Sequence, residues 1–168
     1  MRHGLLIALA LVSAAPAFAA EEPSGCDKFK WPIERERAAL TAPDRVRLSS
    51  GSEQVAPPPT AITLALVVPG DAGLPMPPGR APKDGTLAGF ATFKNVAKAG
   101  VYTISLSAGA WVDVVQGGHF LKPQVFSGAT DCDGIRKTMK YELSASPFVL
   151  QVSGTKESAI SIAIMPSE

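Results

Sequence analysis

Hydrophobic and polar residues alternate along much of the chain, most regularly over residues 99–115. Successive side chains of a β-strand point to opposite faces, so Tyr102, Ile104 and Leu106 share one face of an extended segment. A second alternating run follows after two small residues at 108–109. We therefore expect the two runs to form a central hairpin of an antiparallel sheet.

Alternation of the same kind predicts further strands on both sides of this pair. The segments are 45–49, 62–68 and 87–94 before it, and a short irregular strand at 120–126 followed by 138–143, 148–153 and 160–164 after it. Short strands separated by turns rich in Gly, Pro and Ser are typical of two-layer β-proteins. The sequence thus predicts an all-β fold, an antiparallel β-sandwich or jelly roll of about eight strands with one short N-terminal helix.

The predicted helix covers residues 31–40. Pro32 suits its first turn, and Pro43 ends it. A helix of this length is not stable alone in water, so it must pack on the sheet. Ile33 and Leu40 lie one heptad apart and are expected to cover one end of the sheet. An amphipathic helix that binds a partner is the alternative interpretation.

A proline-rich segment over residues 69–85 separates two predicted strands, and we interpret it as one long surface loop. Its centre, Pro75-Met76-Pro77-Pro78, fits a polyproline conformation of the kind that aromatic grooves recognise. A rigid connector is the alternative, and it is the interpretation that we favour. Long loops on rigid scaffolds often carry binding sites, so Met76 is a candidate ligand-binding residue.

The N-terminus has the pattern of a signal peptide over residues 1–19. Arg2 is followed by an apolar run at 5–12 and by a small-x-small pattern at 17–19, which predicts cleavage after Ala19. The apolar run is too short to span a bilayer, and no later window approaches the roughly twenty residues required, so we expect no transmembrane segment. A bacterial periplasmic or secreted protein is therefore predicted.

The chain has two cysteines, Cys26 and Cys132. In an exported protein this even number favours a disulfide between them. Two separate buried thiols are the alternative, and metal binding is disfavoured because further ligands are not nearby. Lipidation of Cys26 is also disfavoured, since Pro23 stands where a lipoprotein signal has Leu. The mature chain then consists of an N-terminal segment at 20–43, with its helix packed on the sheet, and a β-sandwich domain at 44–166.

Composition supports one globular domain. Charged residues make up 18% of the 168 positions and hydrophobic residues 46%, and fifteen Gly and fifteen Pro favour a loop-rich β-protein over a helical one. The net charge of +1 gives no long-range attraction to phosphate. We therefore expect no nucleic-acid partner.

Groups suited to catalysis are few. His119 is the only histidine after the predicted cleavage site, and no Gly-x-Ser-x-Gly motif presents a nucleophile to it. One histidine cannot build a cupin-like metal centre. The Asp-Cys-Asp-Gly segment at 131–134 resembles a fragment of a calcium loop but lacks the later ligands. We expect no metal and no cofactor, and a hydrolase that uses His119 is the alternative function.

Trp111 and Asp113 fall on the same face of their predicted strand. An aromatic ring beside a carboxylate is the arrangement with which sugar-binding sandwiches hold a pyranose. In the alternative interpretation Trp111 faces the second layer and Asp113 lies at a strand end. The high average burial of tryptophan favours this alternative.

The segment Ala-Gly-Val-Tyr-Thr-Ile-Ser-Leu at 99–106 resembles a strand of the bacterial pre-peptidase C-terminal domain, a β-sandwich. A larger set of segments is similar to a group of small exported bacterial proteins of uncharacterised function. These segments are 110–116, 126–128, 131–132, 134–137 and 150–154. The resemblance implies a β-sandwich in the cell envelope, and it implies no active site.

The sequence therefore predicts an exported, non-catalytic β-sandwich that binds a ligand, or an unidentified protein or glycan partner, in the cell envelope. Its candidate ligand-binding residues are Trp111, Asp113, His119 and Met76. Besides the hydrolase, a stress-related protein that maintains envelope integrity without a discrete ligand is an alternative.

Overall fold

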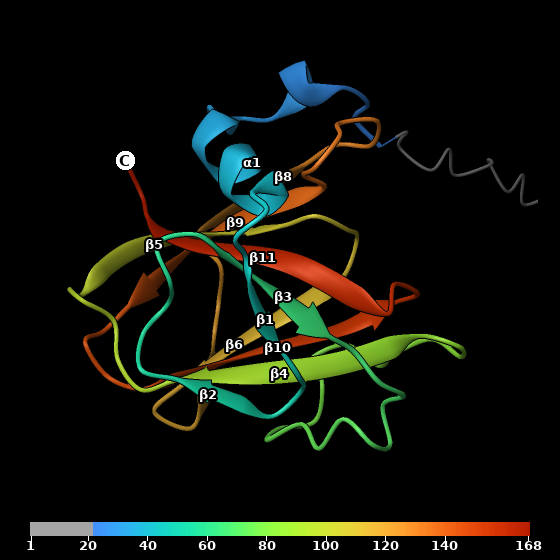
Figure 1. Ribbon diagram of the computed structural model, residues 1–168, viewed down its shortest axis with the longest axis vertical. Helices are drawn as coiled ribbons and strands as arrows, with labels where there is room; N and C mark the ends of the chain where they lie inside the picture. The colour runs from blue at the N-terminus through green and yellow to red at the C-terminus, as the bar shows by residue number, and fades with distance from the viewer. Residues whose placement is uncertain (1–21) are drawn as a thin grey trace, which may run out of the picture.

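The structure is a computed structural model that describes residues 22–168, so the signal peptide predicted at 1–19 lies outside the described residues. In these described residues, eleven strands form two sheets that enclose one main core, and a single α-helix lies outside them (Figure 1). The predicted all-β sandwich is confirmed, with more strands than the eight expected.

The first sheet has six strands in the order β1 (Val46–Leu48), β3 (Ala61–Ala65), β11 (Ala159–Pro166), β5 (Gly100–Leu106), β9 (Lys137–Leu143) and β8 (Val125–Gly128). The second sheet has five strands in the order β2 (Ser52–Gln54), β4 (Leu87–Phe93), β10 (Phe148–Thr155), β6 (Trp111–Gln116) and β7 (His119–Leu121). Neighbouring strands are antiparallel, except that β1 and β2 pair in parallel with β3 and β4.

Alternating apolar residues of both sheets meet in the main core. Ile162 of β11 lies opposite Ile62 of β3, and Leu150 of β10 lies opposite Val114 of β6, all of them buried. This arrangement follows from the two-residue period of a strand, which directs every second side chain inward. The alternation that predicted these strands therefore also divided each of them into two faces, one of which lies in the core.

The predicted hairpin at 99–115 is wrong. Both runs are strands, but β5 belongs to the first sheet and β6 to the second, so residues 107–110 cross from one layer to the other. Alternation marks the buried face of each strand, and a face can be buried equally well from either side of the core. Leu106 and Val112 thus pack into one core from opposite sheets.

Two further differences explain the larger number of strands. The irregular strand expected at 120–126 is in fact two strands, β7 and β8, on either side of Pro123 and in different sheets. Proline has no amide hydrogen for a strand ladder, which is consistent with a break there. The polar strand β2 carries no alternation and was not predicted.

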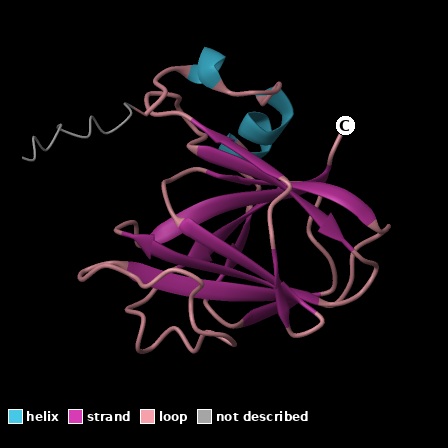
Figure 2. Cartoon of the chain, turned by 180° about the vertical axis from the view of Figure 1, so that it is seen from behind, coloured by secondary structure: helices cyan, strands magenta, loops and turns pink. Residues whose placement is uncertain are grey.

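The helix α1 (Glu34–Thr41) begins at Glu34 rather than at Trp31. Ile33 and Leu40 are buried in a second cluster with Ala61 and Ala163, which belong to β3 and β11 (Figure 2). The helix thus covers the outer face of the first sheet, as its short length requires.

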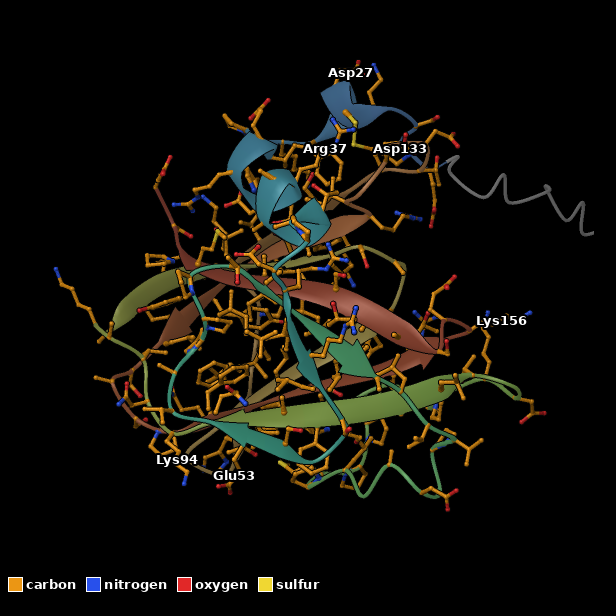
Figure 3. The ribbon with its side chains drawn as sticks, viewed as in Figure 1. Asp27, Arg37, Glu53, Lys94, Asp133 and Lys156 are labelled. Carbon is orange, nitrogen blue, oxygen red and sulfur yellow. A yellow bond between two sulfur atoms is a disulfide. The ribbon has the colours of Figure 1, made fainter. Side chains whose placement is uncertain are left out.

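The predicted disulfide is present. It joins Cys26, in the 3₁₀ turn η1 (Cys26–Lys28), to Cys132 in the loop before β9. Close to it, the guanidinium of Arg37 in α1 donates a hydrogen bond of 2.6 Å to the carbonyl of Asp133 (Figure 3). The N-terminal segment is therefore fixed to the sandwich by a covalent bond and by hydrogen bonding. None of the helices described over residues 22–168 is long and apolar enough to cross a membrane.

Candidate functional site

The outer face of the second sheet carries an unusual group of polar and aromatic residues. Trp111 and Asp113 alternate with the core residues of β6, and they lie opposite Ser153 and Gln151 of β10. Partners directly across two strands share a face, so these four side chains all point away from the main core. The two layers of the sandwich therefore do not explain why Asp113 and Gln151 are buried.

The proline-rich loop provides that burial. The Met76 amide donates to Gln151 Oε1 at 3.0 Å, Gln151 Nε2 donates to the Met76 carbonyl at 3.1 Å, and the Gly79 amide donates to Asp113 Oδ2 at 2.9 Å. The loop lies beneath β4, on the side away from the first sheet (Figure 1). Asp113 is consequently only 8% exposed and Gln151 1%.

Trp111 and Asp113 form a hydrogen-bonded pair. The indole Nε1 donates to Asp113 Oδ1 at 2.8 Å, while the Gly79 amide occupies Oδ2. The interpretation that Trp111 faces the second layer, with Asp113 at a strand end, is wrong. Val112 and Val114 fill the core, so alternation turns both Trp111 and Asp113 outward, and Asp113 lies within β6.

Gly79 is fitted closely to this pair. A Cβ atom at this position would lie 2.7 Å from Asp113 Oδ1 and 3.5 Å from Trp111 Nε1. Real Cβ atoms do not approach a neighbour at the shorter of these distances, so only glycine lets the backbone reach the carboxylate. The loop therefore contacts Trp111 and Asp113 through its main chain.

Two cations approach the ring of Trp111. Arg80 Cζ and Lys137 Nζ each lie 5.8 Å from the ring centroid, and Lys137 Nζ also donates to the Ala110 carbonyl at 3.3 Å. Partial burial, reinforced by the positive charges of Arg136 and Arg80, lowers the pKa of Lys137. We call Gly79, Arg80, Trp111, Asp113 and Lys137 the Trp111 site.

His119 lies apart from the Trp111 site. It follows the tight Gly117-Gly118 turn at the opposite end of β6, about 17 Å along the strand from Trp111 at the usual rise per residue. Its side chain is exposed and makes no hydrogen bond to another described residue. The fold thus brings Met76, Trp111 and Asp113 together and leaves His119 separate.

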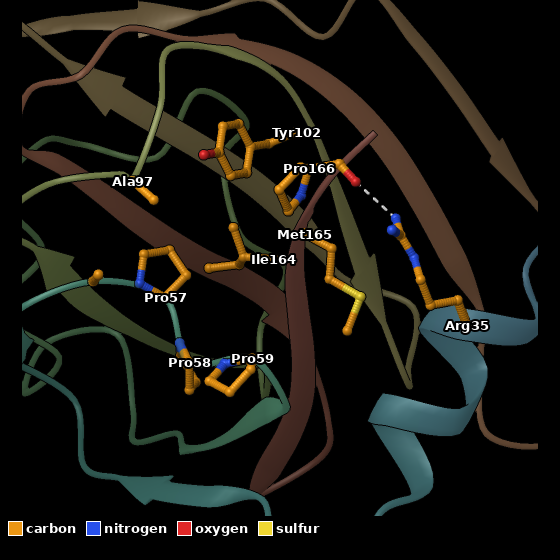
Figure 4. A pocket seen from close by; sticks show the side chains of 10 residues that line it. Arg35, Pro57, Pro58, Pro59, Ala97, Tyr102, Ile164, Met165 and Pro166 are labelled. Carbon is orange, nitrogen blue, oxygen red and sulfur yellow. Dashed lines mark hydrogen bonds between the residues drawn. The ribbon is translucent and has the colours of Figure 1, made fainter. Parts of the chain in front are cut away.

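Two grooves lie elsewhere, beside α1. The first, of about 370 Å³, is mainly apolar and is lined by Pro57, Pro58, Pro59, Tyr102, Ile164, Met165 and Arg35 among others (Figure 4). The second, of about 400 Å³, is more polar and lies between Trp31, Glu36, Lys140 and Glu168. The Trp31 indole Nε1 is buried without a hydrogen-bond partner in the described part of the chain.

Sequence reasoning missed several residues of these sites. Arg80 and Lys137 belong to segments far apart in the sequence, and no local pattern links either of them to Trp111. Gln151 alternates with core residues and resembles any outward polar residue of a strand. Gly79 and Arg80 do lie within the loop already identified as a binding candidate, but nothing in the sequence singles out either residue.

In residues 22–168 no group of three or more His, Cys, Asp or Glu side chains is arranged to hold a metal ion. The Trp111 site combines an aromatic ring, a positioned carboxylate and two cationic side chains. Comparison of the chain with protein-family models, with curated proteins and with solved structures finds no match.

Proposed function

We propose that this protein is an exported, non-catalytic β-sandwich that binds a saccharide of the bacterial cell envelope at the Trp111 site. The observation that carries the proposal is the Trp111–Asp113 hydrogen bond of 2.8 Å on the outer face of a sheet. This bond fixes the orientation of a half-buried aromatic ring beside polar groups, which is the combination that a sugar ring requires.

The chemistry of a saccharide matches these groups. The apolar C–H face of a pyranose packs against an aromatic ring, while its hydroxyl groups need donors and acceptors around the rim. Each carboxylate oxygen accepts more than one hydrogen bond, so Asp113 keeps acceptor capacity after binding Trp111 and Gly79. Arg80, an exposed side chain near the ring, supplies donors.

Rigidity of the scaffold also favours binding. Trp111 and Asp113 lie on β6, which pairs with β10 in the second sheet, and the loop beside them is fixed through Met76 and Gly79. A binding group that is already ordered loses little conformational freedom when a ligand arrives. This favours a preformed site over one that must fold around its ligand.

Export to the periplasm, or secretion, rests on the signal-peptide pattern at 1–19 and is supported by the disulfide between Cys26 and Cys132. Disulfides persist in oxidising compartments and are rare in the cytosol. The hydrolase that uses His119 stays a prediction. A general base needs a partner within hydrogen-bond reach, and the His119 side chain makes no hydrogen bond to another described residue. An envelope-integrity protein without a ligand likewise stays a prediction.

Glycan binding tests the proposal directly. Three proteins are applied to an array of peptidoglycan fragments, lipopolysaccharide oligosaccharides and capsular glycans. They are the mature parent protein, the variant Trp111→Ala and the control variant Trp31→Ala. We expect the parent protein and Trp31→Ala to retain the same glycans and Trp111→Ala to lose them. Retention of no glycan by the parent, or unchanged retention by Trp111→Ala, contradicts the proposal. Circular dichroism of each variant establishes that it is folded.

A further inference from the structure

Lys137 is a partly buried cation without an acidic partner. It is the first residue of β9, and its Nζ contacts a neutral carbonyl, that of Ala110, and the face of Trp111. In residues 22–168 no carboxylate forms an ion pair with Lys137 or with Arg80. A charge that is removed from water without a counter-charge is unfavourable.

Other positive charges surround Lys137. Arg80 lies near the same ring, and Arg136 precedes Lys137 in the chain. Two carboxylates lie in this region. Glu22 forms an ion pair with Arg136, and the oxygens of Asp113 accept from the neutral donors of Trp111 and Gly79. Three cationic side chains, Arg80, Arg136 and Lys137, thus stand against these two carboxylates, and the local charge is positive.

This local excess of positive charge is costly for the free protein and favourable for an anionic ligand. A carboxylate or phosphate near Lys137 and Arg80 would offset the repulsion between them and form charge-assisted hydrogen bonds. Arginine binds such groups in a two-pronged geometry, while lysine acts as a single point of positive charge. Arg80 Cζ and Lys137 Nζ each lie 5.8 Å from the centroid of the Trp111 ring, so both positive charges are close to a ligand that binds at this ring.

We propose that the Trp111 site selects an anionic saccharide, whose carboxylate or phosphate is bound between Arg80 and Lys137 while its sugar ring packs on Trp111. This inference rests on the proposed function, because it names the class of ligand for the same site. It assigns Arg80 and Lys137 as ligand-binding residues that set specificity for charge.

The anion-binding subsite at Arg80 and Lys137 is tested with simple anions, which need no knowledge of the sugar. The ¹H–¹⁵N signals of the two indole groups are followed while the mature protein is titrated with acetate, inorganic phosphate or chloride at matched ionic strength. Trp31 is an internal control, because a lysine also lies near its ring but Glu36 and Glu168 line the same groove. We expect saturable shifts of the Trp111 signal with acetate or phosphate and none at Trp31.

Variants of Arg80 and Lys137 then test whether these two charges bind the anion. Arg80→Gln and Lys137→Met should each weaken anion binding about tenfold, the effect of losing one charge-assisted hydrogen bond. Lys156→Met, which removes an exposed lysine between β10 and β11, should leave it unchanged (Figure 3). Stronger binding of acetate identifies a carboxylated sugar, and stronger binding of phosphate a phosphorylated one.

The possible failures are distinguishable. If acetate and phosphate shift the Trp111 signal no more than chloride does, the anion-binding subsite is wrong. If, in addition, the array still shows glycan retention that depends on Trp111 but not on Lys137, the saccharide function stands without it. Saturable binding of anions combined with no retained glycan overturns the saccharide and leaves an anion site of another kind.

Discussion

Gln151 binds both backbone polar groups of Met76 through the two ends of its carboxamide. The side chain thereby takes the place of a neighbouring strand and gives the loop the pair of hydrogen bonds that a β-bridge would supply. Since Gln151 is 1% exposed, water cannot readily replace either bond. The position of the proline-rich loop over the second sheet therefore depends strongly on one residue of β10.

Replacing Gln151 with Glu should release the centre of the loop. The carboxylate cannot donate to the Met76 carbonyl, and it adds a buried charge, so we expect a loss of about 1–3 kcal/mol in the free energy of unfolding. Urea unfolding at pH 7 measures the loss. It should shrink at acidic pH, where a protonated Glu can donate again. Gln54→Glu on the surface strand β2 is the control, and equal effects of both variants would contradict the assignment.

Gly79→Ala should displace the loop from Asp113, because the new Cβ would lie 2.7 Å from Oδ1. A clash of this kind in a packed site costs about 1–3 kcal/mol. Gly70→Ala is the matched control in the same loop, since nothing lies within 4 Å of its Cβ position, and its effect should stay within about 0.5 kcal/mol. Urea unfolding measures the stability of both variants, and tryptophan fluorescence detects a change in the surroundings of Trp111. If Gly79→Ala does not change the stability, the loop does not pack on Trp111 and Asp113.

Removal of the disulfide should loosen the N-terminal segment first. Cys26 and Cys132 are separated by 106 positions, and loss of a bond that closes so long a loop typically costs about 2–5 kcal/mol. We expect the Cys26→Ser/Cys132→Ser variant to unfold at lower urea and to lose hydrogen-exchange protection in α1 before β10. Unchanged unfolding of the parent protein under reducing conditions would contradict this expectation.

Tyr141 should make the protein less stable at alkaline pH. Burial, together with the negative charge of Asp113, raises the pKa of Tyr141 above its ordinary value of 10.0. The folded state then keeps a proton that the unfolded state releases, so the stabilisation is complete below pH 10 and is lost as the pH rises beyond it. Tyr141→Phe should remove this decline. Equal slopes of unfolding free energy against pH for both proteins would show that another group is responsible.

Lys137→Met should stabilise the free protein at pH 7. The lowered pKa of Lys137 means that, between this pKa and the ordinary value of 10.5, the unfolded state binds more protons than the folded state. The stability of the parent protein therefore rises with pH through that window, and Lys137→Met should lack the rise. Thermal unfolding from neutral to alkaline pH measures both effects. A less stable Lys137→Met at pH 7 would indicate that the charge is compensated in the free protein.

The candidate site was predictable only in part. Strict alternation correctly placed Trp111 and Asp113 on one face, but the average burial of tryptophan directed that face to the wrong side of the sheet. The two residues that alternate with this pair predict the buried face of the strand better. Val112 and Val114 are more apolar than Trp111 and Asp113, and they occupy the core.

Gly79, Arg80 and Lys137 illustrate what could not be predicted. Their contacts with Trp111 and Asp113 join the loop after β3, the start of β6 and the start of β9. Each residue taken alone is an ordinary loop or strand residue. The cationic surroundings of the ring exist only because the two sheets bring these three segments to one end of the sandwich.

The sequence alone determined where most of the strands lie and which two cysteines could be joined. A strand is recognised locally by its two-residue period, and two cysteines allow a single pairing. Only the tertiary structure decided that β5 and β6 belong to different sheets and that the proline-rich loop closes over Asp113. Those choices depend on how all the apolar faces are buried together. Such long-range packing cannot be recognised from the pattern of neighbouring residues in the sequence.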